Sequence, residues 1–394
     1  MTLSTTCKLI CRIIQKRCGS SCSERMAAPV PVRLARVAGY QGRSNDIVYT
    51  PPWSPSPPDS NAVQQSSSQV VVFFGGDVQD FSENMEAHRD NKRYAKWNLE
   101  NTASILQSQF ENHHIVVVRP SRLASHKLAT FMDLLSPDQE QRRMEFKMFS
   151  CFDNFVPCNN TGAPDHTPMH FALLHLERLL QNISVRLNER KQQVGAAEQQ
   201  NSSTNKATTG SGTATVGNSN ADSNEQVVCR LDKCDSLTLI GFSKGCVVLN
   251  QFVYEFHYLK TLTPDDQSLS EVVSRISDMY WLDGGHSGGK NTWVTSRSLL
   301  ETLTRLGIRV HVHVTPFQIN DDRRPWIRKE ERSFTEWLKR LGAPLSRHVH
   351  FDSLPPNLAT HLELITAFKQ STPTTTAISS PTTDEEVSDS APQS

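Results

Sequence analysis

Residues 236–251 read SLTLIGFSKGCVVLNQ and join a short apolar run to an apolar helical pattern through the pentapeptide GFSKG. Leu237, Leu239 and Ile240 are typical of a buried strand, and residues 246–254 place apolar side chains on one helical face. A G-x-S-x-G motif between a strand and a helix predicts a nucleophile elbow, a sharp turn that holds a reactive serine above a sheet. Side chains at the two glycine positions would collide with the neighbouring strand and helix. The alternative is an ordinary Gly-Ser turn without chemistry.

Composition narrows the class of protein. The chain has 394 residues, with 41 Lys and Arg against 41 Asp and Glu, and this balance argues against a nucleic-acid-binding protein. No apolar run approaches the roughly 20 residues that a transmembrane helix needs. The nine cysteines are irregularly spaced, which favours free thiols in a reducing compartment, and those near the start make an unlikely metal site.

The ends and linkers of the chain have biased compositions. Residues 1–43 are basic and serine-rich with a single acid, Glu24, which is typical of a mitochondrial transit peptide and predicts import, most simply into the matrix. Residues 44–68 contain the Pro- and Ser-rich stretch and are predicted to be a linker. Residues 191–226 and 371–394 are polar, and we expect a disordered insert and a disordered C-terminal tail.

Between these segments, strand and helix patterns alternate. Strands are expected at 69–74, 115–118, 237–240, 279–282, 308–314 and 348–351, and helices at 94–110, 138–149, 165–180, 246–254, 296–306, 332–341 and from 359 onward. This alternation predicts one domain over residues 69–370, an α/β three-layer αβα sandwich with a doubly wound, mostly parallel sheet. Active-site groups in such a sheet lie beyond the carboxyl ends of the strands.

That rule selects partners for Ser243, because a serine hydroxyl needs a base and the base needs an orienting carboxylate. His361 follows the last strand and fits the chain order Ser, acid, His of α/β-hydrolases, although it could also be a solvent-facing residue at a helix start. Asp321 follows the penultimate strand and is the preferred acid, with Asp283 as the alternative acid and Asp322 as a neighbour that stays open.

Further residues at the strand ends are candidates for the pocket. Gly76 and Asp77 follow the strand 69–74, and their amides, with that of Lys244, are expected to form an oxyanion hole; the alternative is a tight strand exit. His286 lies in a glycine-rich strand exit, where it could bind substrate, compete as the base, or form an ordinary loop hydrogen bond.

Several long strings resemble one family, the mitochondrial α/β-hydrolase-like proteins typified by human chromosome-2 open reading frame 69. The strings are VVFFGGDVQDF, RYAKWNLENTASILQSQF, FDNFVPCNNTGAPDH, GFSKGCVVLNQ, WLDGGHSGG with NTWVT, and VHVTPFQI. The resemblance spans about residues 69–185 and 227–368. It implies a mitochondrial protein of α/β-hydrolase fold without an established substrate, and by position it gives Ser243, Asp321 and His361 as the triad.

The sequence therefore predicts a mitochondrial serine hydrolase that cleaves an ester, thioester or amide of a small-molecule or acyl substrate. This chemistry requires no cofactor and no metal ion. Two alternatives remain: a non-catalytic hydrolase-fold module that binds a mitochondrial protein partner, and a structural or regulatory subunit, which would expose large apolar patches.

Overall fold

The computed structural model describes residues 28–53, 68–125, 148–159, 162–204, 229–262 and 266–369. Its strands are β1 (Val32–Ala38), β2 (Ser44–Thr50), β3 (Gln69–Phe74), β4 (His113–Val118), β5 (Arg122–Ser125), β6 (Met148–Cys151), β7 (Ser236–Phe242), β8 (Ile276–Leu282), β9 (Arg309–Val314) and β10 (Leu345–Val349). Its α-helices are α2 (Ser82–Ala87), α3 (Leu99–Gln109), α5 (Ala172–Thr204), α6 (Cys246–Leu262), α7 (Gln267–Arg275), α8 (Arg297–Arg305), α9 (Pro316–Ile319), α10 (Pro325–Arg340) and α11 (Leu358–Ala367).

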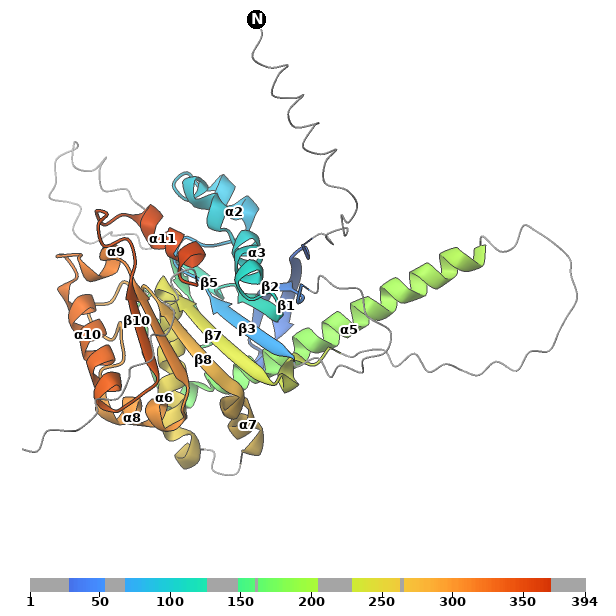
Figure 1. The fold of residues 1–394 in the computed structure, drawn as a ribbon. Helices are drawn as coiled ribbons and strands as arrows, with labels where there is room; N and C mark the ends of the chain where they lie inside the picture. Colours follow the sequence, from blue (N-terminus) through green and yellow to red (C-terminus); the bar gives the residue numbers. More distant parts are fainter. Residues whose placement is uncertain are drawn as a thin grey trace, which may run out of the picture.

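Eight strands form one sheet in the order β1-β2-β4-β3-β7-β8-β9-β10 (Figure 1). The strands from β4 to β10 in this order are parallel, and β1 and β2 are antiparallel. The chain first builds outward from β3 to β4 and then in the other direction from β7 to β10, so the order reverses between β3 and β7. Ligands of doubly wound sheets bind at such a reversal, beyond the carboxyl ends of the strands. The predicted fold class, a mostly parallel sheet of α/β-hydrolase type, is confirmed.

Strands β1 and β2 correct the predicted start of the domain. Residues 32–50 pair as an antiparallel hairpin, and β2 joins the sheet beside β4, with Ile47 opposite Val118. The domain therefore begins at β1 rather than at residue 69, and neither a transit peptide to residue 43 nor a linker from residue 44 fits. The hairpin is ordered because its apolar side chains, among them Leu34 and Val37, are fully buried. Residues 1–27, 54–67 and 370–394, with the predicted C-terminal tail, lie outside the described residues.

Two other expected segment boundaries differ from the structure. Helix α5 continues to Thr204, so the predicted disordered insert does not start at residue 191; residues 205–226 of it lie outside the described residues. Figure 1 shows the far end of α5 projecting away from the sheet. The predicted helix 138–149 overlaps β6 at its end, and the rest of it is not described.

Helices cover both faces of the sheet, as a three-layer sandwich requires (Figure 1). The apolar sides of α5, α6, α8 and α10 form one core with alternate strand residues such as Val72, Leu239 and Trp281. The intervening strand residues, such as Phe73 and Ile240, face the other way and pack with α3 and α11. Side chains of successive strand residues point to opposite faces, which explains the strand patterns that are apolar throughout.

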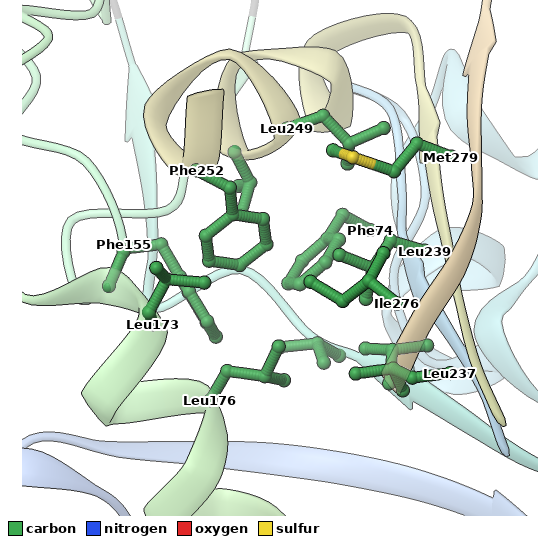
Figure 2. Packing of buried hydrophobic residues seen from close by; sticks show 14 of the residues in the cluster. Phe74, Phe155, Leu173, Leu176, Leu237, Leu239, Leu249, Phe252, Ile276 and Met279 are labelled. Atoms are coloured by element: carbon green, nitrogen blue, oxygen red, sulfur yellow. The ribbon is translucent and has the colours of Figure 1, made fainter. Parts of the chain in front are cut away.

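The larger core fixes the ends of β3 and β7. Figure 2 shows Phe74, the last residue of β3, against Phe155 and Phe252. The Phe74 ring lies edge-on to both, with centroids 5.0 Å from that of Phe155 and 6.1 Å from that of Phe252. Because Phe252 belongs to α6, this cluster packs α6, the helix after the elbow, against the end of β3.

No helix in the described part of the chain is long and apolar enough to cross a membrane.

Candidate active site

The G-x-S-x-G stretch forms the predicted sharp turn between β7 and α6. Ser243 has a φ of 52°, in the left-handed region that a serine rarely adopts. The flanking glycines are sterically required: a Cβ on Gly241 would lie 2.8 Å from Cys246 Cα, and one on Gly245 would overlap the carbonyl oxygen of Phe74. The turn therefore depends on both glycines, and it holds Ser243 beyond the end of β7, as an elbow requires.

The strand register places Asp283 level with the serine. Phe242 pairs with Leu282, so the next residues, Ser243 and Asp283, leave adjacent strands at the same height. Asp283 is completely buried and accepts hydrogen bonds from the Thr315 amide, at 2.8 Å, and from the Thr315 hydroxyl, at 2.5 Å. These bonds fix the carboxylate at the sheet edge with one oxygen directed at the start of α11.

That oxygen binds the predicted histidine. His361 Nδ1 lies 2.6 Å from Asp283 Oδ2. The His361 ring lies between the rings of Phe242 and Phe317, with both centroid distances 4.6 Å, and the ring is almost fully buried. Because a carboxylate accepts hydrogen bonds, Nδ1 carries the proton and Nε2 is left as a base. His361 is therefore not the solvent-facing residue that the sequence left open.

Asp321, the preferred acid, does not contact His361. It lies beyond α9, which carries the chain away from the end of β9 toward the cavity rim. Its carboxylate binds Arg323 Nε at 3.0 Å and Arg324 Nε at 2.9 Å. Hydrogen bonds from Arg323 and Arg324 lower the pKa of the Asp321 carboxyl. The prediction of Asp321 as the orienting acid was wrong, and the alternative acid, Asp283, occupies that position.

Ser243 and His361 open into the same cavity, which has a volume of about 420 Å³. Its walls come from the loop after β3, the elbow, the loops after β8 and β9, and the start of α11. Asp77, His286 and Asp321 also line it. A cavity of this size holds a small organic molecule.

The predicted oxyanion hole is only partly available. Gly76 lies against the elbow, because a Cβ on it would be 3.0 Å from the Cβ of Ser243. Its amide, however, donates to Gln79 Oε1 at 2.9 Å, so the Gly76 amide is already used. The amides of Asp77 and Lys244 remain the candidates. The Lys244 side chain is fully buried and donates to the Gly162 carbonyl. It therefore does not act as a phosphate-binding lysine.

Asp77 connects the cavity to the small β5–β6 sheet. Its Oδ1 accepts from the Ser150 amide at 2.9 Å, and the Ser150 hydroxyl donates to the Gly76 carbonyl at 3.1 Å. Burial raises the pKa of the Asp77 carboxyl, and the nearby Lys244 charge opposes that rise. Ser150 thus holds the backbone on which the candidate oxyanion amide sits, a role that the sequence did not indicate.

His286 lines the cavity but has no carboxylate partner among the described residues. Its Nδ1 accepts from the Gly288 amide at 2.9 Å, so the neutral ring carries its proton on Nε2. Burial lowers the pKa of His286 to about 3, the Lys244 charge adds to this, and the Asn291 backbone opposes it. His286 is therefore a neutral hydrogen-bond donor, and the position of the base belongs to His361.

One group of described residues offers metal-type ligands: Cys151, Asp153 and Cys158, whose ligand atoms lie within 4.8 Å of one another. Cys151 is the last residue of β6 and the other two follow it, and none of the three lines the cavity. The Lys244 charge reaches Cys158, where it lowers the thiol pKa against larger effects of Cys151 and burial. We assign no role in the site to this group.

Comparison with known proteins gives a family and a set of structural likenesses. The family model described as C2orf69 matches residues 33–142 and 140–344. The mitochondrial protein C2orf69 homologue of Danio rerio is 35% identical over 355 residues, covering 89% of each chain. The Mus musculus homologue is 37% identical over 312 residues, covering 76% of this chain and 77% of its own. Human mitochondrial protein C2orf69 is 35% identical over 325 residues, covering 80% and 78%.

Among solved structures, similar chains include a fluorophosphonate-binding serine hydrolase of Staphylococcus aureus, with a TM-score of 0.37, 9% identity, and coverage of 87% of this chain and 97% of its own. The siderophore hydrolase EstB of Aspergillus nidulans has a TM-score of 0.35 and 11% identity, with coverage of 88% and 95%. Similarity at this level of identity and TM-score does not show that the chain shares the activity of either protein.

Proposed function

The chain belongs to the C2orf69 family, and from this premise and the geometry of the site we propose that it is a mitochondrial serine hydrolase that cleaves an ester, thioester or amide. The observation that carries the proposal is the buried hydrogen bond between Asp283 and His361, in a cavity that His361 shares with the elbow serine. An orienting acid, a base and a serine on a strained turn are the parts that acyl transfer needs.

In the proposed mechanism, Ser243 Oγ attacks the substrate carbonyl while His361 Nε2 takes the hydroxyl proton. The proton on Nδ1 stays in its bond to Asp283, whose negative charge stabilises the imidazolium. The amides of Asp77 and Lys244 stabilise the oxyanion, each donor contributing roughly 3 kcal/mol. The imidazolium then gives its proton to the leaving group. Water, deprotonated by the same nitrogen, hydrolyses the acyl-serine and restores the enzyme.

The mitochondrial location is part of the proposal. The curated relatives carry mitochondrial names, and the basic segment before β1 has the composition of a transit peptide. We place the protein in the matrix and the processing site before Val32, because β1 is a strand of the sheet and its removal would expose the edge of β2.

The test is labelling of the full chain with a fluorophosphonate probe, which reacts with activated serines. We expect the wild-type protein to be labelled, Ser243→Ala to be unlabelled, and His361→Ala to be labelled far more slowly. Ser287→Ala is the matched control, because Ser287 lines the same cavity and has no place in the mechanism. Unfolding midpoints establish that each variant is folded. If the folded wild type is not labelled, the proposal fails and the non-catalytic binding module becomes the better description.

A further inference from the structure

Two arginines at the cavity share one carboxylate partner. Asp321 is the shared partner of Arg323 and Arg324, so one carboxylate faces two guanidinium groups. Arg323 uses Nε, Nη2 and its own amide to bind this carboxylate. Among the described residues, the Arg324 side chain has a single hydrogen bond, from Nε to Asp321. Its two terminal nitrogens, which carry four N–H donors, are left for another acceptor.

The two arginines differ in where they point. The Arg323 side chain is 86% exposed, whereas the Arg324 side chain is 26% exposed. The Arg324 charge also acts on groups across the cavity. At Asp77 burial raises the pKa and Arg324 opposes the rise, and at His286 burial lowers the pKa and Arg324 adds to the lowering. Both arginines line the cavity, but Arg324 is the more buried of the two and keeps unused donors, whereas Arg323 binds Asp321 through Nε, Nη2 and its amide.

A second donor in the same cavity belongs to the His286 ring. His286 is 3% exposed, and its Nε2 forms no hydrogen bond with any described residue. The Gly288 amide donates to Nδ1, so the neutral ring carries its proton on Nε2, and the backbone of Asn291 is an acceptor that acts on the same ring without completing a bond to Nε2. A ligand oxygen within reach of Nε2 would complete a hydrogen bond to this buried donor.

The acids that face the cavity limit where an anion can sit. Asp321 is already paired with two arginines, and Asp77 is held by Ser150 beside the elbow. Arg324 is thus a cavity-lining cation with donors left for an anionic group, whereas the Asp77 carboxyl, beside the elbow, offers an anion no donor while it is ionised. This arrangement suits a substrate with its reactive carbonyl at one end and its charge at the other.

We propose that Arg324 binds an anionic oxygen group, a carboxylate or a phosphate, on the substrate of Ser243, and that the enzyme selects charged acyl compounds over neutral ones. The inference rests on the proposed hydrolase function. Guanidinium groups bind carboxylate and phosphate oxygens through paired N–H donors, and these charge-assisted bonds are stronger than neutral ones. The His286 Nε2–H supplies a further donor to the bound substrate.

The first experiment compares two esters of equal chain length, the para-nitrophenyl ester of pentanoic acid and the mono-para-nitrophenyl ester of glutaric acid. We expect wild type to have the higher kcat/KM for the glutarate ester. Arg324→Gln is expected to reduce this preference by roughly 10- to 100-fold. Arg323→Gln is the matched control: it loses the same partner, Asp321, but its side chain is 86% exposed, so we expect its preference to stay within about three-fold of wild type.

Each outcome separates the inference from the proposed function. Fluorophosphonate labelling of wild type and of Arg324→Gln reports the integrity of the catalytic groups independently of substrate charge. Normal labelling with a preference for the neutral ester, or with equal effects of the two arginine substitutions, overturns the inference and leaves the hydrolase proposal intact. Absence of labelling and of hydrolysis of both esters refutes the hydrolase proposal instead.

Direct binding tests the anion site even without turnover. Calorimetric titration of Ser243→Ala with glutarate and, separately, with inorganic phosphate distinguishes the two anions. We expect one of them to bind, and Arg324→Gln in the same background to weaken it by roughly 10-fold or more. If Arg324→Gln does not fold, Arg324→Lys, which keeps the charge and loses the paired donors, replaces it. Binding of neither anion to the folded protein overturns the inference.

Discussion

The choice between two aspartates can be tested by the substitution Asp283→Asn. In the wild type, Oδ1 accepts from the Thr315 amide, and Oδ2 accepts from the Thr315 hydroxyl and from His361 Nδ1. The new amide keeps its oxygen toward the Thr315 amide, so its NH₂ group takes the place of Oδ2. That group donates to Nδ1, the ring proton moves to Nε2, and the nitrogen that must accept the Ser243 proton is blocked.

The size of the effect follows from the same contacts. Turning the amide around to restore the correct tautomer would place its NH₂ against the Thr315 amide, two donors facing each other in a fully buried place. A buried donor left without an acceptor costs roughly 1–3 kcal/mol, and loss of the carboxylate charge weakens the remaining bond to His361. Together these effects predict a loss of roughly 10³- to 10⁴-fold, similar to that of an Asp→Asn change in a serine protease triad.

The assay is the second-order rate of fluorophosphonate labelling, with Asp321→Asn as the control. Asp321 binds Arg323 and Arg324 and has no contact with His361, so we expect its labelling rate to stay within a few-fold of wild type. Circular dichroism establishes that both variants are folded. Equal rates for Asp283→Asn and wild type, or a larger loss for Asp321→Asn, would refute the assignment of Asp283.

Three further predictions concern the fold. Gly245→Ala, whose Cβ overlaps the carbonyl oxygen of β3, is expected to lose at least about 3 kcal/mol in urea unfolding, whereas Gly289→Ala, with open space around it, stays within about 0.5 kcal/mol. Phe252→Ala removes a fully buried ring of the core and should cost about 3–5 kcal/mol; a loss below about 1 kcal/mol would contradict its role. His175 is neutral with both ring nitrogens hydrogen-bonded, and burial lowers its pKa to about 3. Below pH about 6.5 His175 binds a proton in the unfolded chain but not in the folded chain. The free energy of unfolding therefore falls by about 1.3 kcal/mol between pH 7.5 and 5.5 because of this residue. His175→Gln should lose correspondingly less stability over the same pH range.

The correct predictions came from local sequence patterns and from the order of residues along the chain. Ser243 was predictable because the strand, the two glycines and the helix are contiguous, and the turn is decided by their own sterics. His361 was predictable from chain order. The hairpin of β1 and β2 was missed because the basic composition of residues 1–43 suggested a targeting segment, although residues 45–50 include the apolar run Ile47, Val48 and Tyr49.

The acid could not be chosen by the same means. Asp283 and Asp321 both follow strands whose carboxyl ends lie at one edge, and chain order alone admits either. The distinction depends on lateral contacts: Asp283 is level with Ser243 on the adjacent strand, and Asp321 is drawn away by two cations. A local feature did point to the second fact, because Asp321 lies two and three residues before Arg323 and Arg324, and an acid so close to two arginines is expected to pair with them.

The position of the acid on β8 has a consequence for the loop after β9. If Asp321 oriented His361, its carboxylate would be buried at the sheet edge, and the arginines beside it would have to bury their charges or leave the cavity. Asp283, which is hydrogen-bonded to Thr315 after β9, orients His361 instead. The loop beyond α9 therefore places Asp321, Arg323 and Arg324 together at the cavity. The residue that orients the base follows β8, and the residue proposed to bind the substrate charge lies in the segment after β9. Substitutions at Arg324 should therefore change which ester is cleaved without changing the reactivity of Ser243 toward a neutral probe.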